Sequence, residues 1–184
     1  MVNIGRGSSA DFFGYVKKVT VYKLKTYDFC LNSKRMTEHV YQVKVNFEQG
    51  RVGTMTSEVL DEVIKIATPP EFPKGVPGIW SPEHYFVAAI NGCLLTTFLA
   101  IAENFKLNFV DFSSDAEGIL ARVDGKFMMR EVILRPSIVI EKEEDRELAE
   151  KVIIKAERAC LISNSVKTEI KLEYQILVNS TITR

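Results

Sequence analysis

The sequence predicts an α+β fold in which an antiparallel sheet wraps around one long, buried helix. Three observations predict it: a long apolar segment with a strong helix start, several segments of alternating polar and apolar residues, and an amphipathic segment late in the chain. The resulting order of strands, helix, hairpin, helix and strand is typical of α+β domains. With 184 residues, 46% of them hydrophobic, the chain fits one sizeable domain. We divide it into an N-terminal extension with strand character, residues 1–38, and a main domain, residues 39–184.

Alternating residues predict the strands. Residues 15–24 and 39–48 have strand character, and the second segment has the pattern of a half-buried antiparallel strand, with Tyr41, Val43, Val45 and Phe47 on one face. A turn at Gly50 and Arg51 follows, and then a short strand or irregular segment up to residue 66. The pair Asp124-Gly125 predicts a hairpin turn between strands at about 118–123 and 126–141. A last strand is expected over residues 167–178.

The main helix has an unusually clear start. Ser81 can cap it, Pro82 suits the first helical position, and Glu83 faces the positive end of the dipole, so we expect a helix up to about residue 104. Its apolar stretch, 86–102, is interrupted by polar residues and falls short of the roughly 20 residues of a membrane span. We therefore expect no membrane span but a helix buried on nearly all sides. One small sheet covers only one flank, so a partner subunit is the natural second cover.

A second helix is expected over about residues 145–159. Its buried stripe would consist of Leu148, Val152, Ile153 and Ala156. The loop before the main helix, residues 67–79, holds four of the six prolines and is expected to be stiff and irregular.

Composition excludes several classes of function. The chain has 24 basic and 24 acidic side chains, so no overall field favours nucleic acid. The N-terminus lacks the uninterrupted apolar core of a secretory signal, and we expect a cytoplasmic protein. The cysteines are three in number and not clustered, which predicts neither a metal site nor a structural disulfide framework.

Cys93 and Cys160 are the residues that could carry chemistry. From the residues alone, each is more often a buried, structural cysteine. Cys93 lies beyond the reach of the helix dipole and burial raises a thiol pKa, so an active thiolate would need a cation against the sulfur. His84 is not that cation, because nine residues of helix place it on the other side of the axis and about 13 Å away. His39 is not excluded by its spacing, but nothing marks it as a partner. With only two histidines in the chain, a Cys–His hydrolase is a poor fit.

Two segments resemble the OsmC/Ohr family of osmotically induced and organic hydroperoxide resistance proteins. The stretch from Ser81 to Cys93 is similar to the motif that ends in the family's reactive cysteine, and the stretch from Ala156 to Asn164 is similar to the motif of its resolving cysteine. The Gly50-Arg51 turn lies where the family has its catalytic arginine. The Asp124-Gly125-Lys126 hairpin and Leu134-Arg135-Pro136 match the middle of the family pattern, and the resemblance covers roughly residues 40–178. Leu161 departs from it, because proline commonly follows the resolving cysteine, and the first forty or so residues exceed what shorter members carry.

The resemblance implies a fold, an activity and an assembly. The fold would be OsmC-like, and the protein an intertwined homodimer with its active sites at the subunit interface. The activity would be thiol-dependent reduction of organic hydroperoxides, in which Cys93 becomes a sulfenic acid and Cys160 resolves it as a disulfide. A lipoyl-type or similar dithiol would reduce the enzyme again, and no metal or organic cofactor is implied. The alternative is a non-catalytic, stress-related binding protein of the same fold.

Arg51 and Glu83 are the expected partners of the Cys93 thiolate. Arg51 would lower the pKa of the thiol and Glu83 would hold the arginine. Without the resemblance, Arg51 is a solvated turn residue and Glu83 a carboxylate favoured by the helix dipole. Glu83 and Cys93 are about 15 Å apart along a straight helix. We therefore predict that the Arg51 and Glu83 that serve one Cys93 come from the neighbouring subunit.

An apolar substrate needs an apolar pocket, and aromatic residues near the motifs could provide it. The candidates are Trp80, Tyr85, Phe86, Phe98 and Phe127. The alternative for each is core or dimer packing. Cys30 lies in a polar stretch and receives no role.

Overall fold

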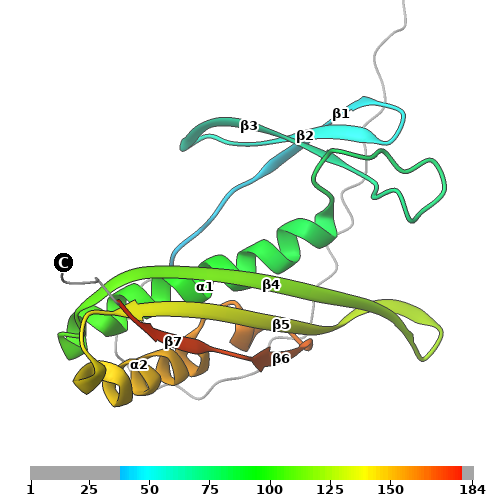
Figure 1. Ribbon diagram of the computed structural model, residues 1–184. Helices are drawn as coiled ribbons and strands as arrows, with labels where there is room; N and C mark the ends of the chain where they lie inside the picture. Colours follow the sequence, from blue (N-terminus) through cyan, green and yellow to red (C-terminus); the bar gives the residue numbers. More distant parts are fainter. Residues whose placement is uncertain (1–37, 180–184) are drawn as a thin grey trace, which may run out of the picture. The chain divides into compact units, whose positions relative to one another are not determined.

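The computed structural model describes residues 38–179. The chain divides after residue 40, and residues 41–184 form the second, compact unit. The predicted strand at 15–24 and Cys30 lie outside the described residues. Within the second unit, three strands form one sheet and four strands form another, and two α-helices accompany them (Figure 1).

The first sheet is antiparallel, in the order β1-β2-β3, with β1 (Lys44–Gln49), β2 (Val52–Ser57) and β3 (Leu60–Ala67). Gly50, at φ 54°, makes the predicted turn before Arg51 and β2. Strand β1 is antiparallel as expected, but it starts later than the predicted strand and all of its residues are exposed. The half-buried pattern is therefore wrong for a single chain, in which Tyr41, Val43, Val45 and Phe47 face solvent.

The second sheet is built on a long hairpin of β4 (Phe109–Val123) and β5 (Lys126–Ile140). Asp124 and Gly125 both adopt the left-handed conformation, at φ 49° and 77°, and confirm the predicted two-residue turn. Strand β4 starts at Phe109, well before the expected position near residue 118. Its first half carries serine and aspartate at the exposed positions Asp111, Ser113 and Asp115, which hides the strand pattern in the sequence.

The expected last strand is split into β6 (Glu169–Leu172) and β7 (Gln175–Val178). Both pair with β5 in parallel, so the predicted antiparallel pairing is confirmed for β4 and β5 but wrong for β6 and β7. The interruption lies opposite Arg135 and Pro136, and Pro136 has no backbone N–H to donate to a ladder.

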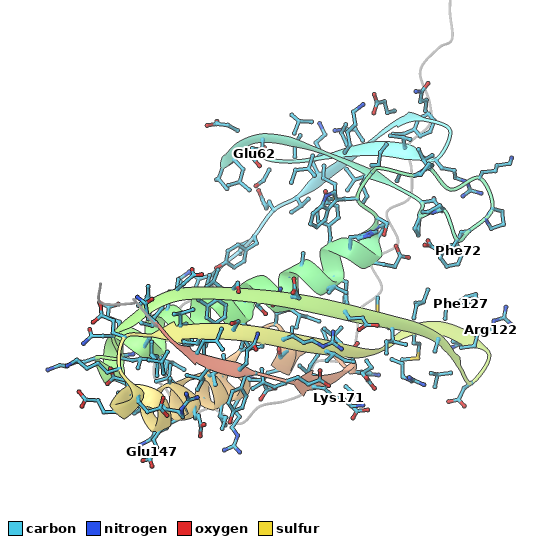
Figure 2. The ribbon with its side chains drawn as sticks, viewed as in Figure 1. Glu62, Phe72, Arg122, Phe127, Glu147 and Lys171 are labelled. Atoms are coloured by element: carbon cyan, nitrogen blue, oxygen red, sulfur yellow. The ribbon has the colours of Figure 1, made fainter. Side chains whose placement is uncertain are left out.

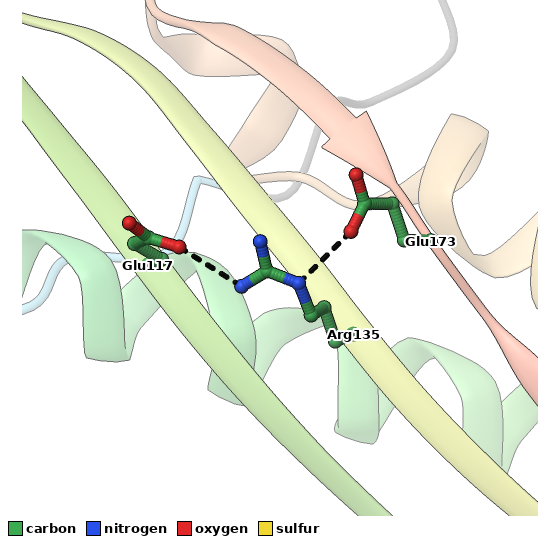
Figure 3. Close-up of polar contacts among 3 residues, drawn as sticks. All are labelled: Glu117, Arg135 and Glu173. Atoms are coloured by element: carbon green, nitrogen blue, oxygen red, sulfur yellow. Dashed lines mark hydrogen bonds and ion pairs between the residues drawn. The ribbon is translucent and has the colours of Figure 1, made fainter.

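A charged side chain crosses the same interruption. Arg135 donates from Nη1 to Glu117 on β4 at 3.1 Å and from Nε to Glu173, between β6 and β7, at 2.9 Å (Figure 3). Both carboxylates raise the pKa of Arg135, which stays fully charged. The guanidinium thereby links the antiparallel and parallel parts of the sheet on its exposed face.

The long helix α1 (Pro82–Phe105) starts as predicted. The Ser81 side chain accepts the backbone N–H of His84, and the His84 ring in turn contacts Ser81. The second helix, α2 (Arg146–Ala159), follows a short 3₁₀ turn, η1 (Glu143–Asp145). Both helices pack on each other and on the second sheet (Figure 1). The core positions of α1 are Ile90, Leu94, Phe98 and Ala102, and those of α2 are Ala149, Val152, Ile153 and Ala156. Leu148 is only half-buried, in contrast to the prediction.

Helix α1 is buried on one face only. Leu95 and Leu99, beside that face, are 37% and 44% exposed, so the expectation of a helix covered on nearly all sides is not met within one chain. By length and composition α1 could also span a membrane, with a mean hydropathy of 1.8 over 18 residues, 22% of them buried. The prediction that this segment is too short for a membrane span is therefore wrong on length and composition. An apolar face of α1 stays open, next to the face that packs into the core.

Candidate active site

The two cysteines singled out by the sequence meet at the contact between α1 and α2. Cys93 lies in the middle of α1 and Cys160 directly follows α2. Their thiols form a side-chain hydrogen bond, although they are far apart in the chain. Cys160 is completely buried and Cys93 is half-buried. The structure thus brings together one accessible and one inaccessible thiol.

The segment after Cys160 folds back over both sulfur atoms. It contains a short 3₁₀ turn, η2 (Ser163–Ser165), and the backbone N–H of Asn164 bonds to the carbonyl of Cys160 at 3.0 Å. The Ile162 N–H donates to Cys93 Sγ at 3.5 Å, and the Ser163 N–H donates to Cys160 Sγ at 3.5 Å. Two consecutive amides therefore serve two different sulfurs.

The surroundings shift the two thiol pKa values in opposite directions. Burial raises the pKa of Cys93, but hydrogen bonds from the Cys160 thiol, the Ile162 amide, the Thr97 hydroxyl and the Leu161 amide together outweigh it, so the pKa lies below its ordinary value. Burial, followed by the hydrogen bond with Cys93, raises the pKa of Cys160. Cys93 is therefore the thiol that ionises first, and the thiolate is the nucleophilic form.

This result corrects one expectation from the sequence. The sequence predicts that an active thiolate needs a cation against the sulfur, but neutral donors within the chain already lower the pKa of Cys93. The guanidinium of Arg51 forms no ion pair or hydrogen bond within residues 38–179, and the Arg51 carbonyl accepts the Thr68 N–H at 3.2 Å.

Glu83 lies in the first turn of α1 and is half-buried. Its Oε2 atom is buried and has no hydrogen-bond partner among the described residues. Neither Glu83 nor Arg51 is bonded to Cys93 in the same chain. The prediction that both reach Cys93 from a neighbouring subunit stays a prediction.

A cleft of about 930 Å³ lies beside the N-terminal half of α1. Its walls come from the proline-rich loop, from α1 and from the β4–β5 hairpin. The lining residues include Phe72, Trp80, Glu83, Asn91, Phe127 and Met129. Asn91 fixes α1 to β4, since its Nδ2 donates to the Ser114 carbonyl at 2.8 Å and its Oδ1 accepts the Ser114 hydroxyl at 2.6 Å. The cleft is thus bounded by a rigid helix–strand contact.

Aromatic contact joins the loop to the tip of the hairpin at this cleft. The rings of Phe72 and Phe127 lie edge to face with centroids 5.6 Å apart, and the Arg122 guanidinium lies 4.9 Å from the centroid of Phe127 (Figure 2). Cys93 does not line the cleft, since it follows His84 by about two and a half helical turns and so lies on the opposite side of α1.

Two of the five predicted pocket residues, Trp80 and Phe127, line the cleft. Tyr85 packs on Trp80 with ring centroids 5.2 Å apart and donates from its hydroxyl to the Lys65 carbonyl at 3.2 Å. The other two pack against or within the core. Phe86 is partly buried against it, and Phe98 is fully buried with its ring on Phe112.

Several donors at the thiols were missed from the sequence, among them the Leu161 amide. Thr97, with Oγ1 at 3.9 Å from Cys93 Sγ, could have been found from its spacing of four residues on a helix. Ile162 acts through a backbone amide, which no residue type reveals. Ser163 belongs to a recognised motif but had no role assigned.

The fold and the site define an α+β protein in which two hydrogen-bonded thiols lie between the two helices. The pKa of one thiol is lowered and the pKa of the other is raised. The chain belongs to the OsmC family: the family model described as OsmC-like protein matches residues 75–175, more than half of the chain. The resemblance stated from the sequence is therefore confirmed.

Similar proteins occur in several organisms. An uncharacterised Bacillus subtilis protein, YmaD, is 28% identical over 78% of this chain and 97% of its own length. An OsmC-like protein of unknown function from Vibrio cholerae has a TM-score of 0.66 at 28% identity, covering 76% of this chain and all of that one. An organic hydroperoxide resistance protein OsmC from Legionella pneumophila has a TM-score of 0.62 at 23% identity, covering 78% of this chain and 100% of that one, and shows the shared fold.

Proposed function

We propose that the protein is a thiol-dependent peroxidase that reduces organic hydroperoxides. The observation that carries this proposal is the Cys93–Cys160 pair, in which the accessible thiol has the lowered pKa and the buried thiol is its direct neighbour. This is the arrangement that a two-cysteine peroxidase cycle needs, because attack requires a thiolate and resolution requires a second thiol within bonding reach.

The cycle balances with these two residues and one dithiol. The Cys93 thiolate attacks the outer peroxide oxygen, the O–O bond breaks, and an alcohol leaves after taking up a proton. Cys160 then loses its proton and its thiolate attacks the sulfur of the Cys93 sulfenic acid; the S–O bond breaks, and the hydroxide takes up a proton and leaves as water while the disulfide forms. A dithiol of lipoyl type reduces the disulfide by two exchange steps and becomes a disulfide itself. The need for such a reductant favours a reducing compartment, the cytoplasm.

A homodimer would complete the site. The cleft lies on the opposite side of α1 from Cys93. Glu83 lines it and has a buried oxygen with no hydrogen-bond partner among residues 38–179. An apolar face of α1, with Leu95 and Leu99, is open to a second copy. We propose that the cleft of one subunit, with Arg51 brought to Glu83, faces Cys93 of the other.

The test is oxidation of the purified protein with one equivalent of cumene hydroperoxide, followed by mass spectrometry. A Cys93–Cys160 disulfide is expected, together with continuous peroxide consumption when dihydrolipoamide is added. The C93S variant should lose both, and a C30S variant should keep both. Sulfenic acid at Cys30 with Cys93 unmodified would overturn the proposal.

A non-catalytic binding protein is the second candidate. The cleft favours a binding protein, because within one chain this cleft of about 930 Å³ is separated from the thiols by the width of α1. Binding of cumene hydroperoxide or its alcohol without consumption in the presence of dihydrolipoamide or dithiothreitol would support this candidate instead.

A further inference from the structure

Cys160 is poorly suited to its own step in the proposed cycle. It is completely buried, and burial together with the hydrogen bond to Cys93 raises its pKa. Resolution nevertheless requires the Cys160 thiolate as nucleophile. Some group near Cys160 must therefore stabilise a negative charge on this sulfur when the second step takes place.

Ser163 is the polar side chain next to that sulfur. Its backbone N–H already donates to Cys160 Sγ at 3.5 Å. Its hydroxyl oxygen is buried and has no partner of correct hydrogen-bond geometry among the described residues, yet it lies close enough to the Cys160 sulfur to act against the rise in the pKa of that thiol. A buried hydroxyl without a partner is costly and calls for an explanation.

The hydroxyl can provide what Cys160 lacks. A serine O–H rotates freely about its C–O bond, so it can turn to donate to an acceptor that appears during a reaction. Two neighbouring carbonyls already accept other donors: that of Cys160 accepts the Asn164 N–H at 3.0 Å, and that of Leu161 accepts the Ser165 hydroxyl at 2.7 Å. The Ser165 hydroxyl is therefore bonded to a carbonyl, whereas the Ser163 hydroxyl remains available to donate to the Cys160 sulfur.

We propose that Ser163 is a positioning residue for the resolving step: its amide and its hydroxyl together hold the Cys160 thiolate while this sulfur attacks Cys93. The proposal deepens the proposed peroxidase cycle and rests on it. Different hydrogen-bond donors of the segment after Cys160 then act in the two steps of the cycle. The Leu161 and Ile162 amides serve Cys93 during attack on the peroxide, and Ser163 serves Cys160 during disulfide formation.

The resolving step can be observed without peroxide. In a C30S background, the aromatic disulfide dithiobis(nitrobenzoate) reacts first with the Cys93 thiolate, which releases one thionitrobenzoate and leaves a mixed disulfide. The Cys160 thiolate then attacks the Cys93 sulfur, the proton of Cys160 goes to solvent, and a second thionitrobenzoate leaves as the Cys93–Cys160 disulfide forms. The two releases separate in time and are measured by absorbance in a stopped-flow instrument.

The test compares Ser163→Ala with the conservative Ser163→Thr. Loss of a hydrogen bond to a charged group should slow the second release roughly tenfold or more in S163A, with the first release unchanged. The pH midpoint of the second release should rise in S163A, and S163T should restore rate and midpoint. With cumene hydroperoxide, dimedone should trap more Cys93 sulfenic acid in S163A than in wild type.

Two results would overturn the inference. One is a second release in S163A at the rate of the wild type, and the other is an equal slowing of both releases, which would indicate a merely structural role. Failure of the peroxidase proposal has a different signature. In that case both releases occur and respond to S163A as described, but the wild-type protein consumes no hydroperoxide.

Discussion

Removing Cys160 should change Cys93 in a way that depends on the replacement. Both Cys160→Ala and Cys160→Ser prevent the disulfide, so neither variant can complete the proposed cycle. Only serine keeps a side chain that can donate a hydrogen bond to Cys93. Because the Cys160 thiol is the leading contact that lowers the pKa of Cys93, C160A should raise that pKa and C160S should leave it low.

The size of the effect follows from the contact. A hydrogen bond to a charged group contributes about 1.5–3 kcal/mol, and a thiol is a weak donor, so about 1.4 kcal/mol is a reasonable value for the half-buried Cys93. This corresponds to roughly tenfold in the population of the thiolate. Alkylation of Cys93 by iodoacetamide follows the thiolate, so at pH values below the pKa of both variants C160A should react roughly tenfold more slowly than C160S.

The assay is the alkylation rate of Cys93 as a function of pH in a C30S background. The sign can be read directly: a thiol that loses a donor to its anion needs a higher pH to ionise, so the curve of C160A should lie to the high-pH side of that of C160S. At high pH Cys93 is ionised in both variants, and the two alkylation rates should converge. Equal rates for C160A and C160S at every pH would refute the role of the Cys160 thiol in lowering the pKa of Cys93.

Three further predictions concern the surroundings of the thiols. Thr97→Val, which keeps the shape and removes the hydroxyl 3.9 Å from Cys93 Sγ, should slow iodoacetamide alkylation near neutral pH by roughly two- to fivefold, and an unchanged rate would exclude this contact. Leu99→Glu on the open face of α1 should raise the dimer dissociation constant by at least about a hundredfold, because a dimer would bury the charge. Sedimentation experiments measure this, with Leu99→Ala as the milder control, and a dimer that persists unchanged argues for another interface. Phe98→Ala should lower the free energy of unfolding in urea by about 3–5 kcal/mol, while Phe127→Ala should mainly raise the KM for cumene hydroperoxide; the reverse pattern would contradict their places in core and cleft.

The sequence predicted the elements that have strong local signals. Ser81 and Pro82 mark the helix start, and Asp124-Gly125 marks the hairpin turn, because each residue type suits one backbone position. The split between β6 and β7 was not predicted, since it depends on Pro136 in a strand that is distant in the sequence. Strand direction was missed for the same reason: alternation indicates a strand but not the orientation of its neighbour.

The candidate site was predicted for its two cysteines and less well for their surroundings. Resemblance to the family singled out Cys93 and Cys160, and the structure places their thiols in contact. The donors that lower the pKa of Cys93 include backbone amides of Leu161 and Ile162, and these depend on the path of the chain and not on its side chains. Phe98 was considered for the pocket because an aromatic residue near a motif has no mark that separates core from cleft.

The placement of the cleft and the thiols on opposite sides of α1 has a genetic consequence. If each site is shared between subunits as proposed, a variant without the thiol and a variant without the cleft carboxylate should complement each other, because the mixed dimer has one intact site. A one-to-one mixture of refolded C93S and E83Q, each inactive alone, should then regain about a quarter of the wild-type activity through random pairing. In such a protein α1 would separate the thiols of a subunit from that subunit's own cleft, and the Cys93 thiol of each subunit would react with a substrate bound by its neighbour.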